Sequence, residues 1–275
     1  MANGQAGQDW LGLAGKVCVV TGGGGGIGGA IAATFAAAGA SVALLDRNAE
    51  TCAANAKALT AKGAKAVAVG CDTSDPASVA DACARVTSAL GPADVLANNA
   101  GLLNPGALAN LTLEAWNANI AVNLTGYFIC AQAFGRAMLE RKKGALVHIA
   151  SIAATNPQPW SGAYSVTKAG VAMLSRQLAA EWGPLGVRSN VVSPGLIRTP
   201  MSEAFYQHNE TAQRRAELVP VGRVGGPQDI ADAVVWLSSE RAAYVSGEEV
   251  IVDGGVTQTL MGLIPRPGFT AAATR

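Results

Sequence analysis

Residues 16–46 constrain the fold more strongly than any other stretch, because their pattern is that of a strand, a glycine-rich turn, a helix and a second strand. The valine-rich opening is typical of a strand that is buried on both faces of a parallel sheet. Five consecutive glycines follow, and then small apolar residues with good helix formers and the apolar run SVALLD. We therefore predict a βαβ unit and, because similar segments follow, an α/β fold.

The glycine cluster lies where the first strand meets the helix, and Asp46 closes the second strand. Glycines allow the backbone to turn sharply, approach a pyrophosphate and point the helix N-terminus at it. The dinucleotide-binding fingerprint G-x-G-x-x-G fits this stretch in two registers, Gly23/Gly25/Gly28 and Gly24/Gly26/Gly29. The alternative is a flexible turn without a ligand, but the flanking strands, the helix and the acidic residue favour a dinucleotide site.

The composition is typical of a cytoplasmic enzyme with a large core, since 50% of the 275 residues are hydrophobic and only 14% are charged. The net charge is +1 without basic blocks, which argues against a nucleic-acid-binding protein. The five scattered cysteines show no C-x-x-C spacing, so we expect reduced cysteines and no metal site. Because the N-terminus lacks a signal-peptide pattern and no apolar run reaches membrane-spanning length, we expect neither secretion nor membrane insertion.

Strand-like and helix-like segments alternate along the whole chain, which predicts one domain built on a parallel sheet. The expected strands lie near residues 17–20, 41–46, 65–72, 93–101, 144–151, 187–195 and 248–255. The expected helices lie near residues 27–38, 49–62, 76–90, 112–140, 161–182 and 227–238. Ligands of such sheets bind at the carboxyl ends of the strands, so polar residues there are the candidates for chemistry.

Three polar residues near these ends have the chemistry of a hydride-transfer site. Tyr164 and Lys168 are four residues apart on one helix face, and Ser151 follows the fifth strand. Reduction of a carbonyl needs a proton at its oxygen, and Tyr164 can exchange that proton if a nearby positive charge lowers its pKa. Lys168 and an oxidised nicotinamide would supply such charge, and Ser151 can donate a hydrogen bond to the same oxygen. The alternative is an exposed Tyr/Lys pair without a catalytic role.

Further motifs follow in a fixed order along the chain. They are TGGGGGIG at 21–28, NNAG at 98–101, VNLTGYF around Asn123, SPGLIRTPM at 193–201 and the stretch 222–255. Together they resemble the compact, single-domain type of short-chain dehydrogenase/reductase. The first motif is similar to the family's T-G-x-x-x-G-I-G, which implies phosphate-binding roles for Gly22, Gly26 and Gly28. The resemblance also implies a catalytic tetrad of Asn123, Ser151, Tyr164 and Lys168, with Asn123 supporting a proton relay through water to Lys168.

The resemblance implies a fold and a cofactor site. It covers a domain of residues 12–256, with a substrate lid at about 196–221, between extensions at 1–11 and 257–275. It implies a Rossmann-type, doubly wound parallel sheet of seven strands in the order 3-2-1-4-5-6-7, with helices on both faces, and a homotetramer. The implied cofactor contacts are Gly22, Gly25, Gly26, Ile27, Gly28, Asp46, Arg47, Asp72, Thr73, Asn99, Ala100, Gly101, Tyr164, Lys168, Pro194, Gly195, Ile197 and Thr199.

The residues at the end of the second strand favour NAD over NADP. A carboxylate at Asp46 can accept hydrogen bonds from both adenosine ribose hydroxyls and would repel a phosphate esterified there. Arg47 follows immediately and could bind that phosphate instead, which keeps NADP as the alternative cofactor.

We therefore expect an NAD-dependent oxidoreductase that interconverts a secondary alcohol and its ketone, with Tyr164 as general acid/base. Asn104, Asn156 and Gln158 lie in turns that the family places near the substrate, and they hint at a polyol, sugar or other hydroxylated compound. Trp160 either stacks on a substrate ring or caps the core. One alternative function is a 3-oxoacyl thioester reductase, which would normally need NADP and a basic surface for its acyl carrier. Another is a non-catalytic dinucleotide sensor, which would not need the tetrad.

The C-terminal extension is too rich in large apolar residues for a solvated tail. These residues are Leu260, Met261, Leu263, Ile264 and Phe269. Pro265 and Pro267 forbid a continuing helix and favour an extended path along a surface. Because the seventh strand already closes the core, we predict that the extension crosses to a neighbouring subunit and borders that subunit's substrate pocket, the alternative being that it folds back on its own subunit. His208, an isolated histidine in the lid, is assigned no catalytic role.

Overall fold

The computed structural model describes residues 10–207 and 209–264. Its centre is a parallel sheet of seven strands in the order β3-β2-β1-β4-β5-β6-β7, which confirms the predicted order. The strands are β1 (Val17–Thr21), β2 (Ser41–Asp46), β3 (Ala66–Gly70), β4 (Val95–Asn98), β5 (Gly144–Ile149), β6 (Val187–Pro194) and β7 (Glu249–Val252). The helices are α1 (Gly26–Ala37), α2 (Ala49–Thr60), α3 (Pro76–Leu90), α4 (Leu113–Ile120), α5 (Gly126–Arg141), α6 (Tyr164–Trp182), α7 (Asn209–Glu217) and α8 (Pro227–Ser238).

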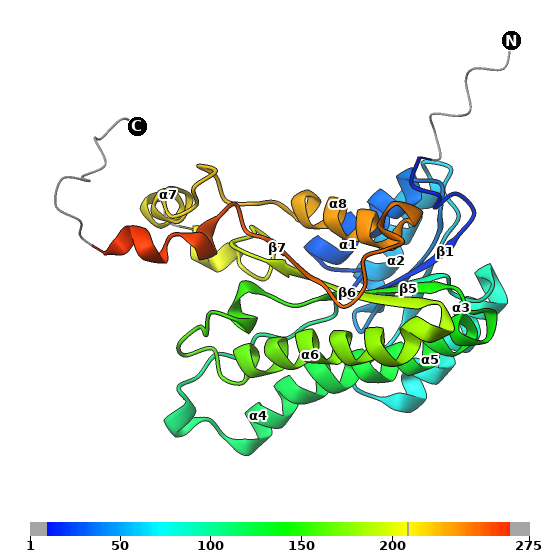
Figure 1. Ribbon diagram of the computed structural model, residues 1–275, viewed down its shortest axis with the longest axis horizontal. Helices are drawn as coiled ribbons and strands as arrows, with labels where there is room; N and C mark the ends of the chain where they lie inside the picture. Colours follow the sequence, from blue (N-terminus) through cyan, green and yellow to red (C-terminus); the bar gives the residue numbers. More distant parts are fainter. Residues whose placement is uncertain (1–9, 208, 265–275) are drawn as a thin grey trace, which may run out of the picture.

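Helices cover both faces of the sheet, with α1, α2 and α8 on one face and α3, α5 and α6 on the other (Figure 1). β1 shows why both faces are needed, because every one of its residues is buried. Cys18 and Val20 belong to the core on one face, and Val17 and Val19 to the core on the other. The continuous valine-rich run is therefore a strand covered on both sides, as the sequence predicts.

β1 lies inside the sheet and pairs with β2 on one side and β4 on the other. β1 leads into α1 on one face of the sheet, whereas β4 is followed by α4 and α5, and α5 packs on the opposite face. A crevice forms where the connections diverge in this way, outside the carboxyl ends of the strands.

The helix expected over residues 112–140 is not one regular helix. α4 and α5 are joined by a π-helical segment, Ala121–Thr125, with Asn123 at its centre. The Asn123 side chain binds both main-chain groups of Leu102, accepting from its N–H at 2.7 Å and donating to its carbonyl at 2.8 Å. We attribute the extra residue in this turn to that two-point contact, because π-bulges place side chains at functional sites.

The helix expected from residue 161 begins at Tyr164 instead. Gly162 has φ +59° and a Cβ there would lie 2.6 Å from the carbonyl oxygen of Asn104, so this position requires a glycine outside the helix. Trp160 is 75% exposed, which excludes one of its two predicted roles, that of capping the core.

Several predictions fall on residues outside the described ranges. His208, Pro265, Pro267 and Phe269 lie outside them, as does most of the N-terminal extension. The part of the C-terminal extension that is described forms two short 3-10 turns, Val256–Gln258 and Leu260–Leu263.

Candidate active site

A cavity of about 700 Å³ lies in the crevice at the carboxyl ends of the strands and extends from the glycine-rich turn to the lid. The predicted site residues that line it are Gly22, Gly25, Gly26, Ile27, Gly28, Asp46, Asn99, Ala100, Gly101, Ser151, Tyr164, Lys168, Pro194, Gly195, Ile197 and Thr199. A smaller hollow of about 150 Å³ adjoins it and is lined by Asp46, Arg47, Asp72 and Thr73. The structure thus brings all predicted cofactor residues to two connected hollows.

The glycine-rich turn forms a cradle that side chains would fill. Gly22 has φ +67°, and a Cβ on Gly28 would lie 2.1 Å from the Gly22 carbonyl oxygen. α1 starts with the N-cap residue Gly25, which offers no side-chain cap, and its first turn contains no acidic residue. Its first N–H groups therefore face the cavity without a competing carboxylate, which fits the pyrophosphate of a dinucleotide.

Asn99 holds this turn against the end of β4. Its Nδ2 donates to the carbonyl oxygens of Thr21 at 2.9 Å and Gly22 at 3.3 Å. In return, Thr21 Oγ1 accepts hydrogen bonds from the main-chain N–H groups of Asn99 and Ala100. These bonds join the ends of two neighbouring strands, so the floor of the cavity is fixed before any ligand binds.

The end of the cavity that would receive the adenosine is acidic. Asp46 accepts from the main-chain N–H of Gly24 and of Asn48, both at 2.9 Å, and each oxygen retains lone pairs for a ribose hydroxyl. Asp72 accepts from the N–H and the hydroxyl of Ser74, at 2.9 and 2.6 Å, and these bonds lower the pKa of Asp72. Asp72 is therefore held in the charged, accepting state.

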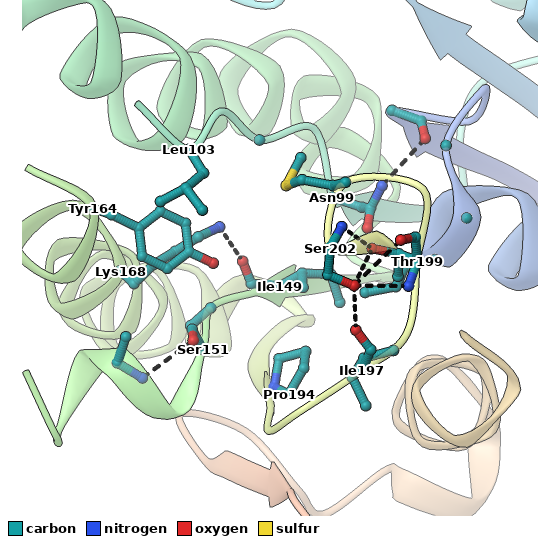
Figure 2. Close-up of a pocket in the computed structure, with 18 of the residues that line it drawn as sticks. Asn99, Leu103, Ile149, Ser151, Tyr164, Lys168, Pro194, Ile197, Thr199 and Ser202 are labelled. Atoms are coloured by element: carbon teal, nitrogen blue, oxygen red, sulfur yellow. Dashed lines mark hydrogen bonds between the residues drawn. The ribbon is translucent and has the colours of Figure 1, made fainter. Parts of the chain in front are cut away.

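Ser151, Tyr164 and Lys168 meet at the other end of the cavity (Figure 2). Because α6 begins at Tyr164, Lys168 lies one turn further along the same face, with its Nζ 5.6 Å from the centre of the Tyr164 ring. Lys168 Nζ donates to the carbonyl of Ile149 at the end of β5, at 2.8 Å. Ser151 follows in the turn after β5, where its Oγ accepts from the N–H of Ala153 at 3.1 Å.

Burial dominates the electrostatics of this cluster. It lowers the pKa of Lys168 to about 7 and raises the pKa of Tyr164, and a hydrogen bond with Ser151 opposes the second effect. We predicted that Lys168 lowers the pKa of Tyr164, but burial of the phenol is the larger influence among the protein's own groups. The protein alone therefore keeps Tyr164 protonated at neutral pH.

Asn123 lies beside this cluster and does not line either hollow described above. Its side chain is bound to Leu102 and also donates to Thr167 Oγ1 at 3.3 Å. A Cβ on Gly101 would lie 3.7 Å from Asn123 Oδ1 and 3.9 Å from Lys168 Nζ, which places both residues next to the same glycine. The amide of Asn123 thus clamps the loop after β4 to the π-helical segment.

The lid contributes residues that sequence motifs did not single out. The lid residues that line the cavity beyond the predicted contacts are Leu196, Pro200, Met201, Ser202 and Arg215, and of these Ser202 and Arg215 lie outside the motifs. Leu102, Leu103, Ile149, Ala150, Ile152 and Ala153 line it from outside the lid. Ser202 Oγ donates to the carbonyl of Ile197 at 2.8 Å and accepts from the N–H of Thr199 at 2.9 Å (Figure 2). No sequence signal identified Arg215, which comes from α7 and lies with its guanidinium 4.9 Å from the Tyr206 ring. The lid is the variable part of such folds, so only the structure could reveal it.

The polar turn residues expected near the substrate are only partly there. Asn156 and Gln158 line the cavity, whereas Asn104 and Trp160 are absent from the described residues that line it.

Within the described ranges, no helix has both the length and the apolar character needed to cross a membrane.

Known proteins are similar to this chain over most of its length. A family model described as "Enoyl-(Acyl carrier protein) reductase" matches residues 22–257. D-threitol dehydrogenase from Mycolicibacterium smegmatis is 40% identical over 245 residues, which are 89% of this chain and 94% of that protein. The "Inactive 2-(S)-hydroxypropyl-CoM dehydrogenase 2" of Xanthobacter autotrophicus is 42% identical over 224 residues, 80% of this chain and 96% of that protein. A solved gluconate 5-dehydrogenase from Burkholderia cenocepacia, in complex with NADP and tartrate, has a TM-score of 0.86 and 31% identity over 92% of this chain and 99% of that one.

Proposed function

The chain belongs to the short-chain dehydrogenase/reductase family, and from this we propose that it is an NAD-dependent oxidoreductase that interconverts a secondary alcohol and its ketone. The observation that carries the proposal is the meeting of Ser151, Tyr164 and Lys168 at one end of the cavity whose other end is the glycine cradle. A dinucleotide that lies along the cavity would then have its reactive ring beside the proton donor.

The chain's own residues would divide the work as follows. A bound nicotinamide supplies or accepts the hydride. Tyr164 Oη exchanges the proton at the substrate oxygen, and Ser151 Oγ donates a hydrogen bond to that oxygen. Lys168 would donate to the nicotinamide ribose hydroxyls and favour the phenolate of Tyr164. We assign Asn123 to the support of a water relay toward Lys168.

The substrate end of the cavity suits a hydroxylated compound with an apolar face. Asn156, Gln158 and Ser202 provide polar groups, and Leu103 and Met201 provide apolar surface. The named substrates of two similar proteins, D-threitol and gluconate, are polyhydroxylated. We propose a polyol, sugar or sugar acid as the substrate class.

A substrate panel tests the function. Purified protein is offered polyols, sugars, sugar acids and simple secondary alcohols with NAD, and their ketones with the reduced cofactor, while nicotinamide absorbance is followed. Turnover of a polyhydroxylated member is expected. Faster reduction of a 3-oxoacyl thioester with NADPH would favour the alternative function, a 3-oxoacyl thioester reductase. Binding of cofactor without turnover of any compound would favour the non-catalytic sensor, and one similar protein is named inactive.

We predict a preference for NAD that depends on the charge of Asp46. Arg47 is exposed and beside it, so steady-state kinetics with both cofactors decides between the two residues. Asp46→Asn keeps an acceptor for the Gly24 N–H but removes the charge that repels a phosphate, so the ratio of kcat/KM for NAD to that for NADP should fall about tenfold. Glu50→Gln, an exposed acid in the first turn of α2, is the control and should leave the ratio unchanged. Wild-type protein that prefers NADP would show that Arg47 decides.

We propose a homotetramer whose contacts include the C-terminal extension. Leu260, Met261 and Ile264 are 69%, 56% and 51% exposed, and Ile251 on the edge strand β7 is 39% exposed. Apolar side chains at one edge are typical of an interface.

Truncation after Thr257 should therefore lower the molar mass measured by light scattering and weaken substrate affinity in the same sample. Removal of residues 1–9 is the control and should change neither. An intact tetramer with unchanged affinity after truncation would reject the crossing of the extension to a neighbouring subunit.

A further inference from the structure

Tyr127 on α5 contacts the catalytic lysine from within the core. Its side chain is 1% exposed, and Lys168 is 3% exposed. Tyr127 Oη donates to the carbonyl of Ile149 at 3.0 Å, and Lys168 Nζ donates to Tyr127 Oη at 3.3 Å and to the same carbonyl at 2.8 Å. The hydroxyl, the ammonium and the carbonyl thus form a closed triangle of hydrogen bonds.

The direction of each bond follows from the donors. A phenol carries one hydrogen, and in Tyr127 it is committed to Ile149, so toward Lys168 the hydroxyl oxygen acts as an acceptor. An ammonium has three hydrogens and no lone pair, and two of them are held by Tyr127 and Ile149. The third is left for the cavity that Lys168 lines.

Among the residues that the structure describes, the titratable groups that face Lys168 include no carboxylate. They are Tyr164 on its own helix, Tyr127 on α5 and His148 on β5. Burial, and secondly Lys168 itself, lower the pKa of His148 to about 3, so this histidine is neutral and adds no positive charge. Its ring stacks on that of Tyr127, with centroids 6.0 Å apart.

We propose that Tyr127 is a positioning residue for catalysis, whose hydroxyl holds the protonated head group of Lys168 between the Ile149 carbonyl and the Tyr164 ring. No carboxylate within the described ranges faces Lys168, and the Tyr127 hydroxyl and the Ile149 carbonyl are the neutral acceptors there that stabilise the buried ammonium. The catalytic consequence rests on the proposed function, whereas the effect on Lys168 does not.

Tyr127→Phe removes only this acceptor. The ring remains against His148, and the Ile149 carbonyl keeps Lys168 as its donor, so no buried polar group is orphaned. The protonated lysine loses a hydrogen bond, and the pKa of Lys168 should fall by about one unit. Lys168 would then be charged in a smaller fraction of molecules at neutral pH.

The first test is an NMR titration of the Lys168 side chain, labelled with carbon-13 and assigned by its loss in Lys168→Met. The midpoint should move about one pH unit lower in Tyr127→Phe. Ser175→Ala is the matched control. Ser175 lies on α6 together with Lys168, and its buried hydroxyl is hydrogen-bonded to that of Ser189 at 2.8 Å. It should leave the midpoint unchanged. An unmoved midpoint in Tyr127→Phe would overturn the proposal, even if alcohol oxidation is established.

The second test is the pH profile of kcat/KM for alcohol oxidation. With less charge on Lys168, the acid limb should move to higher pH because Tyr164 ionises later, and the alkaline limb to lower pH because Lys168 loses its proton sooner. A uniform loss of rate with unmoved limbs would indicate a merely structural role. If Tyr127→Phe does not fold, fluorotyrosine at position 127 keeps the hydroxyl as a weaker acceptor and should lower the Lys168 midpoint by a smaller amount. An unchanged midpoint there would also contradict the proposal.

Discussion

Replacement of Tyr164 by phenylalanine is expected to lower turnover by at least about a hundredfold, the usual scale of lost acid/base catalysis. The change removes one hydroxyl at the end of the cavity where Ser151 and Lys168 meet. Ser151 Oγ keeps its hydrogen bond from the Ala153 N–H, so the site loses its proton donor without losing its shape. Thermal stability and cofactor binding should therefore remain close to those of the wild type.

Rates are measured with the best substrate of the panel, and cofactor affinity is measured by nicotinamide fluorescence. Tyr244→Phe is the matched control, because Tyr244 is fully exposed and the same hydroxyl is lost far from the cavity. It should behave as the wild type does. A Tyr164→Phe protein with near-normal rates would reject the assigned proton transfer.

Replacement of Lys168 by methionine should damage both turnover and cofactor binding. We expect turnover to fall about a hundredfold or more, and cofactor affinity about tenfold, because one ammonium serves the Tyr164 phenolate and the ribose hydroxyls. The variant should nevertheless unfold at a higher temperature, since a buried charge without a carboxylate partner costs stability.

The size of this stability change depends on pH. Lys168 has a pKa of about 7 in the folded protein, below the ordinary value of 10.5. The unfolded chain therefore binds the proton more tightly, and the cost of burying this lysine is largest below pH 7 and declines as the pH rises toward 10.5. Thermal unfolding of wild type and Lys168→Met should differ most in mildly acidic buffer. A lower unfolding temperature for the variant at that pH would contradict this account of the buried ammonium.

Much of the fold could be predicted because short stretches of sequence indicate each strand, turn and helix of the βαβ pattern. The valine run of β1 is buried on both faces, and α3 begins at Pro76 behind the N-cap Asp75, as local rules require. Gly22 and Gly28 could be singled out because a side chain there would block the backbone itself. The structure at each of these residues follows from nearby residues in the sequence or from the glycine motif.

The remainder depends on contacts between distant segments. The π-helical turn at Asn123 arises from a bond to Leu102, and periodicity predicts only a regular helix there. In the sequence, Tyr127 is an ordinary aromatic residue of a helix. Its role depends on the fold, because β5 and α6 place Ile149 and Lys168 against its hydroxyl. Arg215 is a lid residue that lines the cavity, and no local sequence pattern predicts where the lid lies.

The central claim is direct hydride transfer between a secondary alcohol and the nicotinamide ring, and deuterium labelling tests it most directly. An alcohol accepted in the panel is prepared with deuterium on its carbinol carbon and oxidised with NAD, and the reduced cofactor is analysed by NMR. The account predicts deuterium at C4 of the nicotinamide, and transfer at least about a hundredfold slower with Tyr164→Phe. Reduced cofactor that carries only solvent hydrogen at C4, or wild-type protein that reduces no cofactor with any alcohol, would contradict it.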